Sequence, residues 1–128
     1  MNKVGTMAII VYNRLKEDHS SNPNNFPIYR PSVLGNPFSH IKDRNTKAKY
    51  VVGSREEAIA RYSDYFDVMY GSNYAFTKVI DEIYEKYKAG EDVFLECYCH
   101  PLPCHGDVIV EKLRKRLIRE KMEKLTKK

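Results

Sequence analysis

The sequence predicts a small α/β protein of one domain, in which helices flank a mainly parallel sheet. Two short runs of apolar and β-branched residues, at 7–12 and 92–99, have the pattern of buried strands. Between and after these runs, apolar residues recur at helical spacing. Strands separated by helices favour parallel pairing in a layered fold. Because 128 residues can enclose one hydrophobic core, we expect residues 1–118 to form a single domain.

The first half of the chain has little regular pattern after its first strand. Residues 14–27 are polar and rich in Asn, Ser and Pro, which predicts a long loop. Residues 28–30 have the composition of a very short strand, and the two prolines and the glycine within 31–37 then predict a turn. A second short extended piece is expected at 50–52.

Two amphipathic helices are predicted between residues 54 and 90. Ser54 and Glu57 have the spacing of a capping box, which predicts a helix over 55–69 with one buried stripe. A Gly-Ser pair at 71–72 ends this helix, and the second helix ends at Gly90, a residue suited to a left-handed cap.

The last helix is predicted over 105–124, with residues 119–128 as its basic end. We expect its apolar side to pack on the domain, through Val110, Leu113, Leu117, Ile118, Met122 and Leu125. Nine Lys or Arg residues and three Glu residues between Glu111 and Lys128 give this segment a charge of +6, and the other residues are close to neutral. Such a charge attracts nucleic acid or an acidic protein, although the lack of interleaved aromatic residues favours a solvated helix face.

Chemically reactive side chains are concentrated in ECYCHPLPCHGD, residues 96–107, which hold all three cysteines and two of the four histidines. A strand over 92–99 places Cys97 and Cys99 on one face, and prolines at 101 and 103 end it. An odd number of closely spaced cysteines fits reduced thiols better than a disulfide framework. We expect Cys97 to pack in the core.

Three blocks of the sequence resemble the family catalogued as domain of unknown function 4326. They are YRPSVLGNPF (29–38), SREEAIARYSDYF (54–66) and LECYCHPLPCHGDVIVEKL (95–113), in the order and approximate spacing of that family. Such proteins occur largely in phages and bacteria, and the resemblance implies a Rossmann-like α/β fold with a site at the first and third blocks. Two residues depart from the pattern: Tyr98 stands where tryptophan is common, and His100 stands where a small residue is usual.

The start of the last helix predicts an anion site, because its unpaired backbone N–H groups and the positive end of its dipole face outwards. We expect a lowered pKa for the Cys104 thiol, with His105 as proton carrier in nucleophilic chemistry. Asp107 is expected to cap the helix, or to act as a base or as the acceptor for a ribose hydroxyl. Gly106 would let a ligand approach the backbone, and Cys99 would face it from the strand.

The loop at 30–38 is the predicted opposite wall of this site. Arg30 offers a forked donor suited to phosphate or carboxylate. Ser32, Gly35 and Asn36 would present polar groups and backbone amides towards the ligand. Phe38 is expected to plug into the core.

Zinc binding is the alternative for the cysteine cluster. Its ligands would be Cys97, Cys99, Cys104 and His105. These residue types suit tetrahedral zinc, but structural zinc sites usually join two well-separated pairs of ligands. The spacing therefore favours a site without metal.

These observations predict a cytoplasmic protein that binds a nucleotide or another phosphorylated, sugar-containing small molecule. If the protein is an enzyme, we expect hydrolysis or transfer at a phosphate or N-glycosidic bond, with Asp107 or His105 as acid or base. Two alternatives are a non-enzymatic phage protein that binds a host protein or nucleic acid through the basic helix, and a zinc-stabilised nucleic-acid-binding module. No apolar run is long enough to span a membrane, and the N-terminus lacks the features of a secretory signal.

Overall fold

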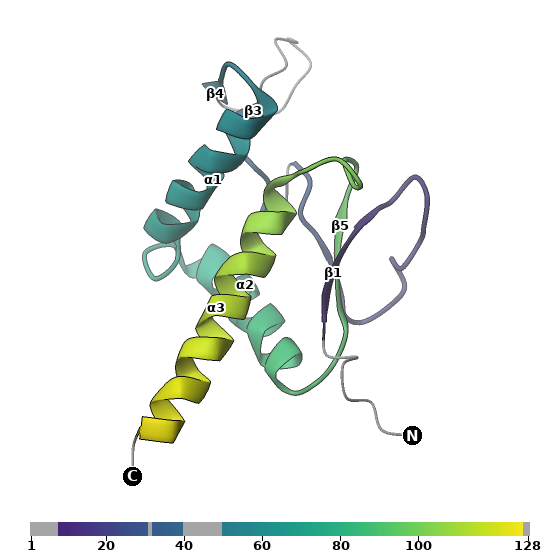
Figure 1. Cartoon of the computed structure of the whole chain (residues 1–128). Helices are drawn as coiled ribbons and strands as arrows, with labels where there is room; N and C mark the ends of the chain where they lie inside the picture. The colour runs from purple at the N-terminus through teal and green to yellow at the C-terminus, as the bar shows by residue number, and fades with distance from the viewer. Residues whose placement is uncertain (1–7, 31, 40–49, 127–128) are drawn as a thin grey trace.

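The computed structural model describes residues 8–30, 32–39 and 50–126, and it has a small α/β fold (Figure 1). The elements are β1 (Ile9–Asn13), β2 (Asn25–Pro27), β3 (Phe38–Ser39), β4 (Tyr50–Val51), α1 (Arg55–Met69), α2 (Tyr74–Lys88), β5 (Val93–Cys97) and α3 (His105–Thr126). The three helices and the two longer strands confirm the prediction from periodicity. The short strand predicted at 28–30 lies earlier, at β2, and β3 directly follows the predicted 31–37 turn, where no strand was expected.

The main sheet has the order β1-β5-β2, and β5 pairs in parallel with both neighbours. Leu95 of the central strand lies beside Val11 on one side and Phe26 on the other. A second, two-stranded parallel sheet is formed by β3 and β4. The predicted parallel sheet is therefore confirmed, whereas three strands are too few to define a Rossmann-like order.

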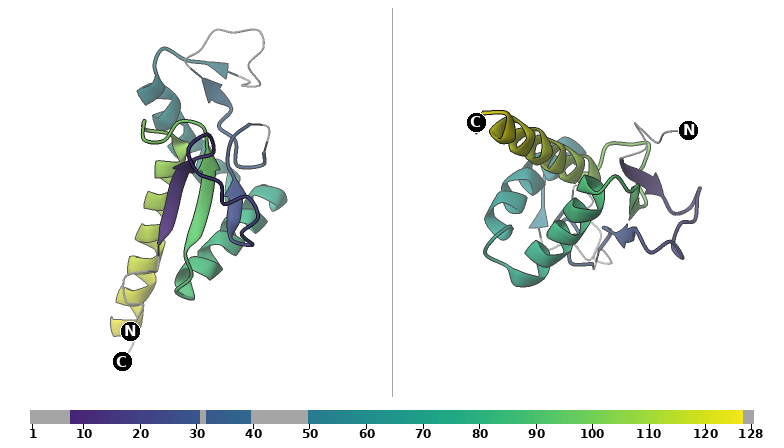
Figure 2. Two further views of the ribbon diagram at one scale, coloured as in Figure 1. Left: turned by 90° about the vertical axis from the view of Figure 1, so that its right-hand side faces the viewer. Right: turned by 90° about the horizontal axis from the view of Figure 1, so that it is seen from below.

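The three helices lie on one face of the main sheet (Figure 2). The loop at 14–24 crosses the other face, where the ring of His19 stacks on Phe94 with a centroid distance of 4.2 Å. This loop allows β1 and β2 to run in the same direction on either side of β5. As a result, the carboxyl ends of all three strands meet at one edge of the sheet.

Side-chain caps explain where α1 and α2 begin. The Ser54 hydroxyl accepts a hydrogen bond from the Glu57 N–H at 3.0 Å, as the capping box predicts. The Glu57 carboxylate reaches back to the N–H of Gly53 at 3.0 Å, one residue earlier than in the usual box. Asn73 caps α2 through the N–H of Phe76.

One hydrophobic core fills the space between the sheet and the helices. Its largest fully buried side chains are Tyr62, Tyr84, Phe76, Ile28, Leu34, Ile80, Ile83, Leu95, Ile109, Leu113 and Val93. The buried Tyr62 hydroxyl donates to the carbonyl oxygen of Leu34 at 2.9 Å, which joins α1 to the 32–37 turn. Burial raises the pKa of Tyr62, so its phenol stays protonated as this donor.

The last turns of α3 extend beyond the domain, which corrects the predicted packing of its whole apolar side (Figure 1). Leu113 and Leu117 are buried, but Ile118 and Met122 are each 57% exposed and Leu125 is 68% exposed. The helix continues past the sheet, and the residues beyond Leu117 have little of the domain to pack against. None of the helices in the described ranges is long and apolar enough to cross a membrane.

Close packing of α3 on the sheet requires a glycine at position 106. A Cβ atom there would lie 2.8 Å from Cδ1 of Ile28 and 3.1 Å from both methyl groups of Val11. The predicted role of Gly106 was to admit a ligand to the backbone, but side chains of the sheet occupy that space. Gly106 therefore sets the distance between helix and sheet.

We predict that Gly106→Ala lowers the free energy of unfolding by about 1–2 kcal/mol, since overpacking costs about 1–3 kcal/mol and better helix propensity offsets up to about 1. Chemical denaturation of the wild type and the variant measures this difference. Glu111→Ala, at an exposed position of the same helix, is the control and should change stability by no more than about 0.5 kcal/mol. Equal stability of Gly106→Ala and the wild type would contradict the packing argument.

Candidate functional site

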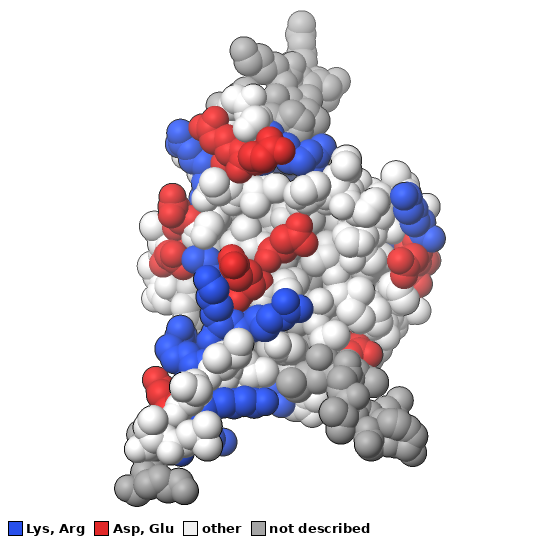
Figure 3. Space-filling view, in the orientation of Figure 1, with Lys and Arg blue, Asp and Glu red and all other residues white. Residues whose placement is uncertain are grey.

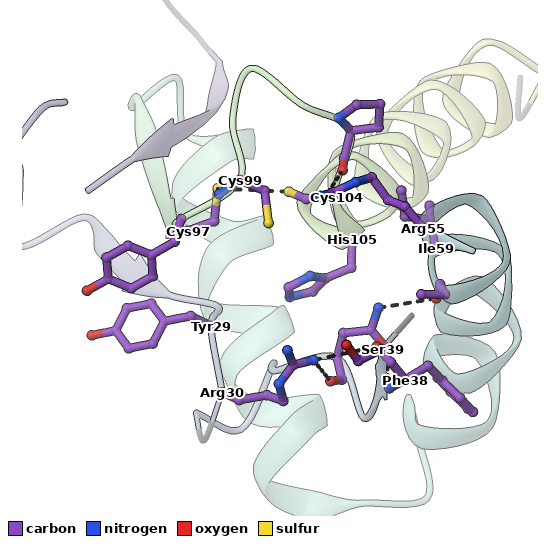
Figure 4. Close-up of a pocket in the computed structure, with 14 residues that line it drawn as sticks. Tyr29, Arg30, Phe38, Ser39, Arg55, Ile59, Cys97, Cys99, Cys104 and His105 are labelled. Atoms are coloured by element: carbon purple, nitrogen blue, oxygen red, sulfur yellow. Dashed lines mark hydrogen bonds between the residues drawn. The ribbon is translucent and has the colours of Figure 1, made fainter. Parts of the chain in front are cut away.

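A cavity of about 380 Å³ lies where the 29–39 segment, the start of α1 and the turn after β5 meet (Figure 4). Its lining residues are Tyr29, Arg30, Asn36, Phe38, Ser39, Arg55, Ala58, Ile59, Cys97, Tyr98, Cys99, Pro103, Cys104 and His105. In Figure 4 the cysteines lie on one side, Arg30 lies on the other, and the ring of His105 lies between them. The two predicted walls therefore face each other across one cavity.

Five of the predicted site residues line this cavity: Arg30, Asn36, Cys99, Cys104 and His105. Ser32, Gly35, Gly106 and Asp107 lie outside its lining. The Ser32 carbonyl accepts the Gly35 N–H at 2.9 Å, and the Ser32 hydroxyl is buried without a partner among the described residues. A Cβ at Gly35 would lie 3.1 Å from the Cα atom of Arg30, so this glycine lets the turn close on Arg30.

The first turn of α3 uses its own side chains to satisfy its backbone donors. The Asp107 carboxylate accepts the Cys104 N–H at 3.1 Å, and the Cys104 sulfur accepts the Gly106 N–H at 3.3 Å. The N–H of Asp107 donates to the Cys104 carbonyl at 3.0 Å. The expected array of unpaired N–H groups is thus largely absent from this described turn, and Asp107 is the helix cap.

The His105 ring connects α3 to the segment that leaves β2. Its Nε2 donates to the carbonyl oxygen of Ile28 at 2.6 Å, and its ring meets Tyr62 edge to face at 4.7 Å. Burial lowers the pKa of His105 to about 4, and the charge of Arg30 acts in the same direction. At neutral pH the imidazole is therefore neutral, with one nitrogen engaged by the backbone.

Two of the three cysteines are in contact. The sulfur atoms of Cys97 and Cys104 lie 3.9 Å apart, and the N–H groups of Cys99 and His100 also point at the Cys97 sulfur, at 3.5 and 3.4 Å. The Cys104 thiol and these N–H groups lower the pKa of Cys97 to about 6. Donation to Cys97, together with burial, raises the pKa of Cys104. The expectation of an acidic Cys104 is therefore wrong, and the acidic thiol is Cys97.

The 30–38 loop is tied to itself and to α1. Arg30 Nη1 donates to the Asn36 carbonyl at 2.7 Å, and the Asn36 side chain donates to the Ala58 carbonyl at 3.2 Å and accepts the Phe38 N–H at 3.0 Å. Both the nitrogen and the oxygen of the Asn36 amide are thus engaged in holding the loop, although the amide was expected to face a ligand. Arg30 is half-buried, and this burial lowers its pKa from the usual value.

No group of three or more His, Cys, Asp or Glu side chains in the described ranges is arranged to hold a metal ion. The alternative zinc ligands Cys97, Cys99, Cys104 and His105 are all described, and they do not form such a group. Of these four residues, Cys97 and Cys104 are in contact through their sulfur atoms, whereas His105 is engaged with a backbone carbonyl.

Three cavity residues were not predicted as site residues, although all three lie within the sequence blocks described above. Arg55 is the first residue of α1, a position where its charge suggests only solubility, and its side chain donates to the Pro103 carbonyl at 3.4 Å. Tyr29 and Tyr98 come from different segments and meet with ring centroids 5.0 Å apart. Each tyrosine is the sequence neighbour of a predicted site residue, Tyr29 of Arg30 and Tyr98 of Cys99, and this proximity was the indication that the sequence offered.

We predict that His105 makes the protein less stable as the pH falls from about 6.5 to about 4. The unfolded chain binds a proton at the ordinary histidine pKa, whereas the folded chain resists protonation, so stability is present above that pKa and is lost below it. The loss from this group is on the order of 3 kcal/mol. Denaturation of the wild type and His105→Gln across this pH range measures it, and the variant should show a shallower decline.

His100→Gln is the matched control, because His100 is exposed on the turn just before α3. It should keep the pH dependence of the wild type. If His105→Gln and the wild type lose stability equally between pH 6.5 and 4, the neutral, buried state assigned to His105 is wrong.

The comparisons with known proteins agree with the three sequence blocks. The family described as Domain of unknown function (DUF4326) matches residues 11–115, which include most of β1, the cavity and the first half of α3. No curated protein and no solved structure matches the chain. Because the matched segment covers far more than half of the sequence, the chain belongs to the DUF4326 family.

Proposed function

We propose that the cavity binds a nucleotide or a closely related phosphorylated, sugar-containing small molecule. The observation that carries this proposal is a pair of arginines, Arg30 and Arg55, that line the cavity without a carboxylate partner among the described residues. A partly buried cation without a counter-ion favours the binding of an anion.

The guanidinium groups are placed to act on a ligand. Among the nitrogens of the Arg30 guanidinium group, Nη1 donates to the carbonyls of Asn36 and Phe38, and the others have no backbone partner in the described part of the chain. These bonds fix the plane of the guanidinium group and leave further N–H donors for a ligand. Arg55 is anchored at 3.4 Å on the Pro103 carbonyl, on the other wall. Two guanidinium groups, each anchored to a backbone carbonyl of a different wall, suit the several oxygens of a phosphate.

The aromatic part of the cavity lining suits the base of a nucleotide. Tyr29, Tyr98 and Phe38 line the cavity, and Tyr98 is 47% exposed, so part of its side chain is accessible to a ligand. A volume of about 380 Å³ lies within the range of small-molecule sites, about 300–1,000 Å³. The position at the carboxyl ends of parallel strands is also where ligands bind in open α/β sheets.

Binding is better supported than catalysis. An acid or base role was predicted for His105 and Asp107, but the His105 Nε2 is held by a backbone carbonyl and Asp107 caps α3 outside the cavity. The described residues offer one acidic nucleophile in the lining, the Cys97 thiol. If the protein turns over its ligand by hydrolysis or transfer at a phosphate or N-glycosidic bond, this thiol is the better candidate nucleophile.

We predict that the protein binds mononucleotides and that Arg30→Ala and Arg55→Ala each weaken binding about tenfold to hundredfold, because each removes a charge-assisted hydrogen bond. Calorimetry with adenosine, guanosine, cytidine and uridine monophosphates measures the affinities, and the parent nucleosides show the contribution of the phosphate. Arg61→Ala is the control, since Arg61 lies on α1, is exposed, and pairs with Glu57 outside the cavity.

Thermal denaturation of each variant establishes that it is folded before its affinity is compared. Nucleosides that bind as well as the monophosphates would contradict the anion-binding role. Equal effects of Arg61→Ala and Arg30→Ala would show that overall charge, and not the cavity, determines affinity.

A second candidate function is the docking of an acidic protein on the exposed end of α3. Ile118, Met122 and Leu125 are separated by four and three residues, so their exposed side chains share one helix face. Basic side chains gather along α3 on the face shown in Figure 3. An apolar stripe beside positive charge fits an acidic protein surface better than a phosphate backbone.

Deleting residues 122–128 separates the two candidates. This truncation keeps Glu120, which accepts a 2.6 Å hydrogen bond from the buried Tyr84 and pairs with Arg116. We predict that mononucleotide affinity, measured by calorimetry, is unchanged within about twofold, because the cavity lies at the other end of α3. A large loss of nucleotide affinity would mean that the basic end of the helix, and not the cavity, holds the ligand.

A further inference from the structure

We infer that Cys97 and Cys104 form a redox-active dithiol, which a small disulfide such as oxidised glutathione reaches through the cavity and converts to an intramolecular disulfide. The two sulfur atoms lie 3.9 Å apart, and both residues line the cavity. Cys97 ends β5, and Cys104 immediately precedes α3, so the pair bridges the turn between strand and helix. This inference is independent of whether the cavity binds a nucleotide.

Cys97 is the attacking sulfur. Its sulfur accepts from the N–H groups of Cys99 and His100 and from the Cys104 thiol, three donors that stabilise a thiolate. They hold its pKa at about 6, so most of it is deprotonated at neutral pH. Cys104 keeps its proton and has only one recorded donor, the N–H of Gly106. Cys104 is therefore suited to the second step.

The reaction takes place in two exchanges. The Cys97 thiolate attacks one sulfur of the small disulfide, which forms a mixed disulfide at Cys97 and releases one thiolate. Cys104 then attacks the Cys97 sulfur, which forms the Cys97–Cys104 bond and releases the second thiolate, and the Cys104 proton passes to a released thiolate. The two cysteines are oxidised, and the small disulfide is reduced to two thiols.

The geometry distinguishes Cys104 from Cys99 as the second cysteine. Cys99 also lines the cavity, but its recorded contact with Cys97 is through its backbone N–H, whereas Cys104 contacts Cys97 through its sulfur. Bond formation requires the two sulfurs to approach to about 2 Å. The Cys104 sulfur already faces Cys97 from the start of a long helix. Cys99 thus provides a matched control of the same residue type in the same cavity.

The test is treatment of the full-length protein with oxidised glutathione, followed by acid quenching, intact mass measurement and peptide mapping. The wild type and Cys99→Ser should each lose two hydrogens in mass and retain no glutathione, with Cys97 linked to Cys104. Cys104→Ser should retain one glutathione at Cys97, because the second exchange is blocked. Cys97→Ser should react at least about tenfold more slowly than Cys104→Ser.

Three results would overturn the inference: a wild type that accumulates a glutathione adduct, a disulfide that includes Cys99, or a wild type that does not react under conditions that oxidise a dithiol peptide. The wild type and Cys99→Ser keep the pair intact, so their outcome does not depend on the folding of the other variants. Thermal denaturation before treatment identifies any variant that is unfolded.

Discussion

The hydrogen bond from His105 to the Ile28 carbonyl is the contact on which the candidate site depends. It joins the first residue of α3 to the segment that leaves β2 and continues into the 30–38 loop, so it holds the two walls of the cavity at a fixed distance. The ring can take this position because Gly106, the next residue, lets the helix lie against Ile28 and Val11. Burial of the ring keeps it neutral, and a neutral ring can remain beside Arg30 without repulsion.

The polar residues near the cavity divide into those that build it and those that face its interior. Asp107 caps α3, and the Asn36 side chain ties the 30–38 loop to α1. Arg30 and Arg55 have anchored guanidinium groups without a carboxylate in the described part of the chain. This division explains why the site supports binding of an anion more strongly than acid–base chemistry. The carboxylate and the imidazole that catalysis was expected to use have structural partners.

The sequence predicted the helices well because each has a local pattern. The capping box at Ser54, the glycine at 90 and the period of the apolar residues mark helix ends and buried faces without reference to the rest of the chain. The short strands β2 and β3 were misplaced or missed, since strands of two or three residues are defined by the neighbour with which they pair. The exposure of Ile118 could not be predicted from periodicity either. Periodicity gives the apolar face of a helix, but it does not show where the surface on which the helix packs comes to an end.

The same distinction applies to the candidate site. The cluster of cysteines and histidines at 96–107 indicated one wall of the cavity, and Arg30 in the 30–38 loop indicated the other. Their roles depended on partners distant in the chain: Ile28 engages His105, and Val11 occupies the space beside Gly106. The lowered pKa of Cys97 follows first from the Cys104 thiol and then from the backbone N–H groups of the turn after β5, partners that the spacing of the cysteines does not reveal. Arg55 entered the site only through the packing of α1 against the other elements.

The most direct test of the account is a titration of the isotopically labelled protein with adenosine monophosphate, followed by backbone amide NMR. If the two walls form one anion site, amides of the 32–39 segment and of the 98–105 turn shift together and with one affinity. Shifts that are confined to the basic end of α3, or that appear at only one of the two walls, would contradict the account.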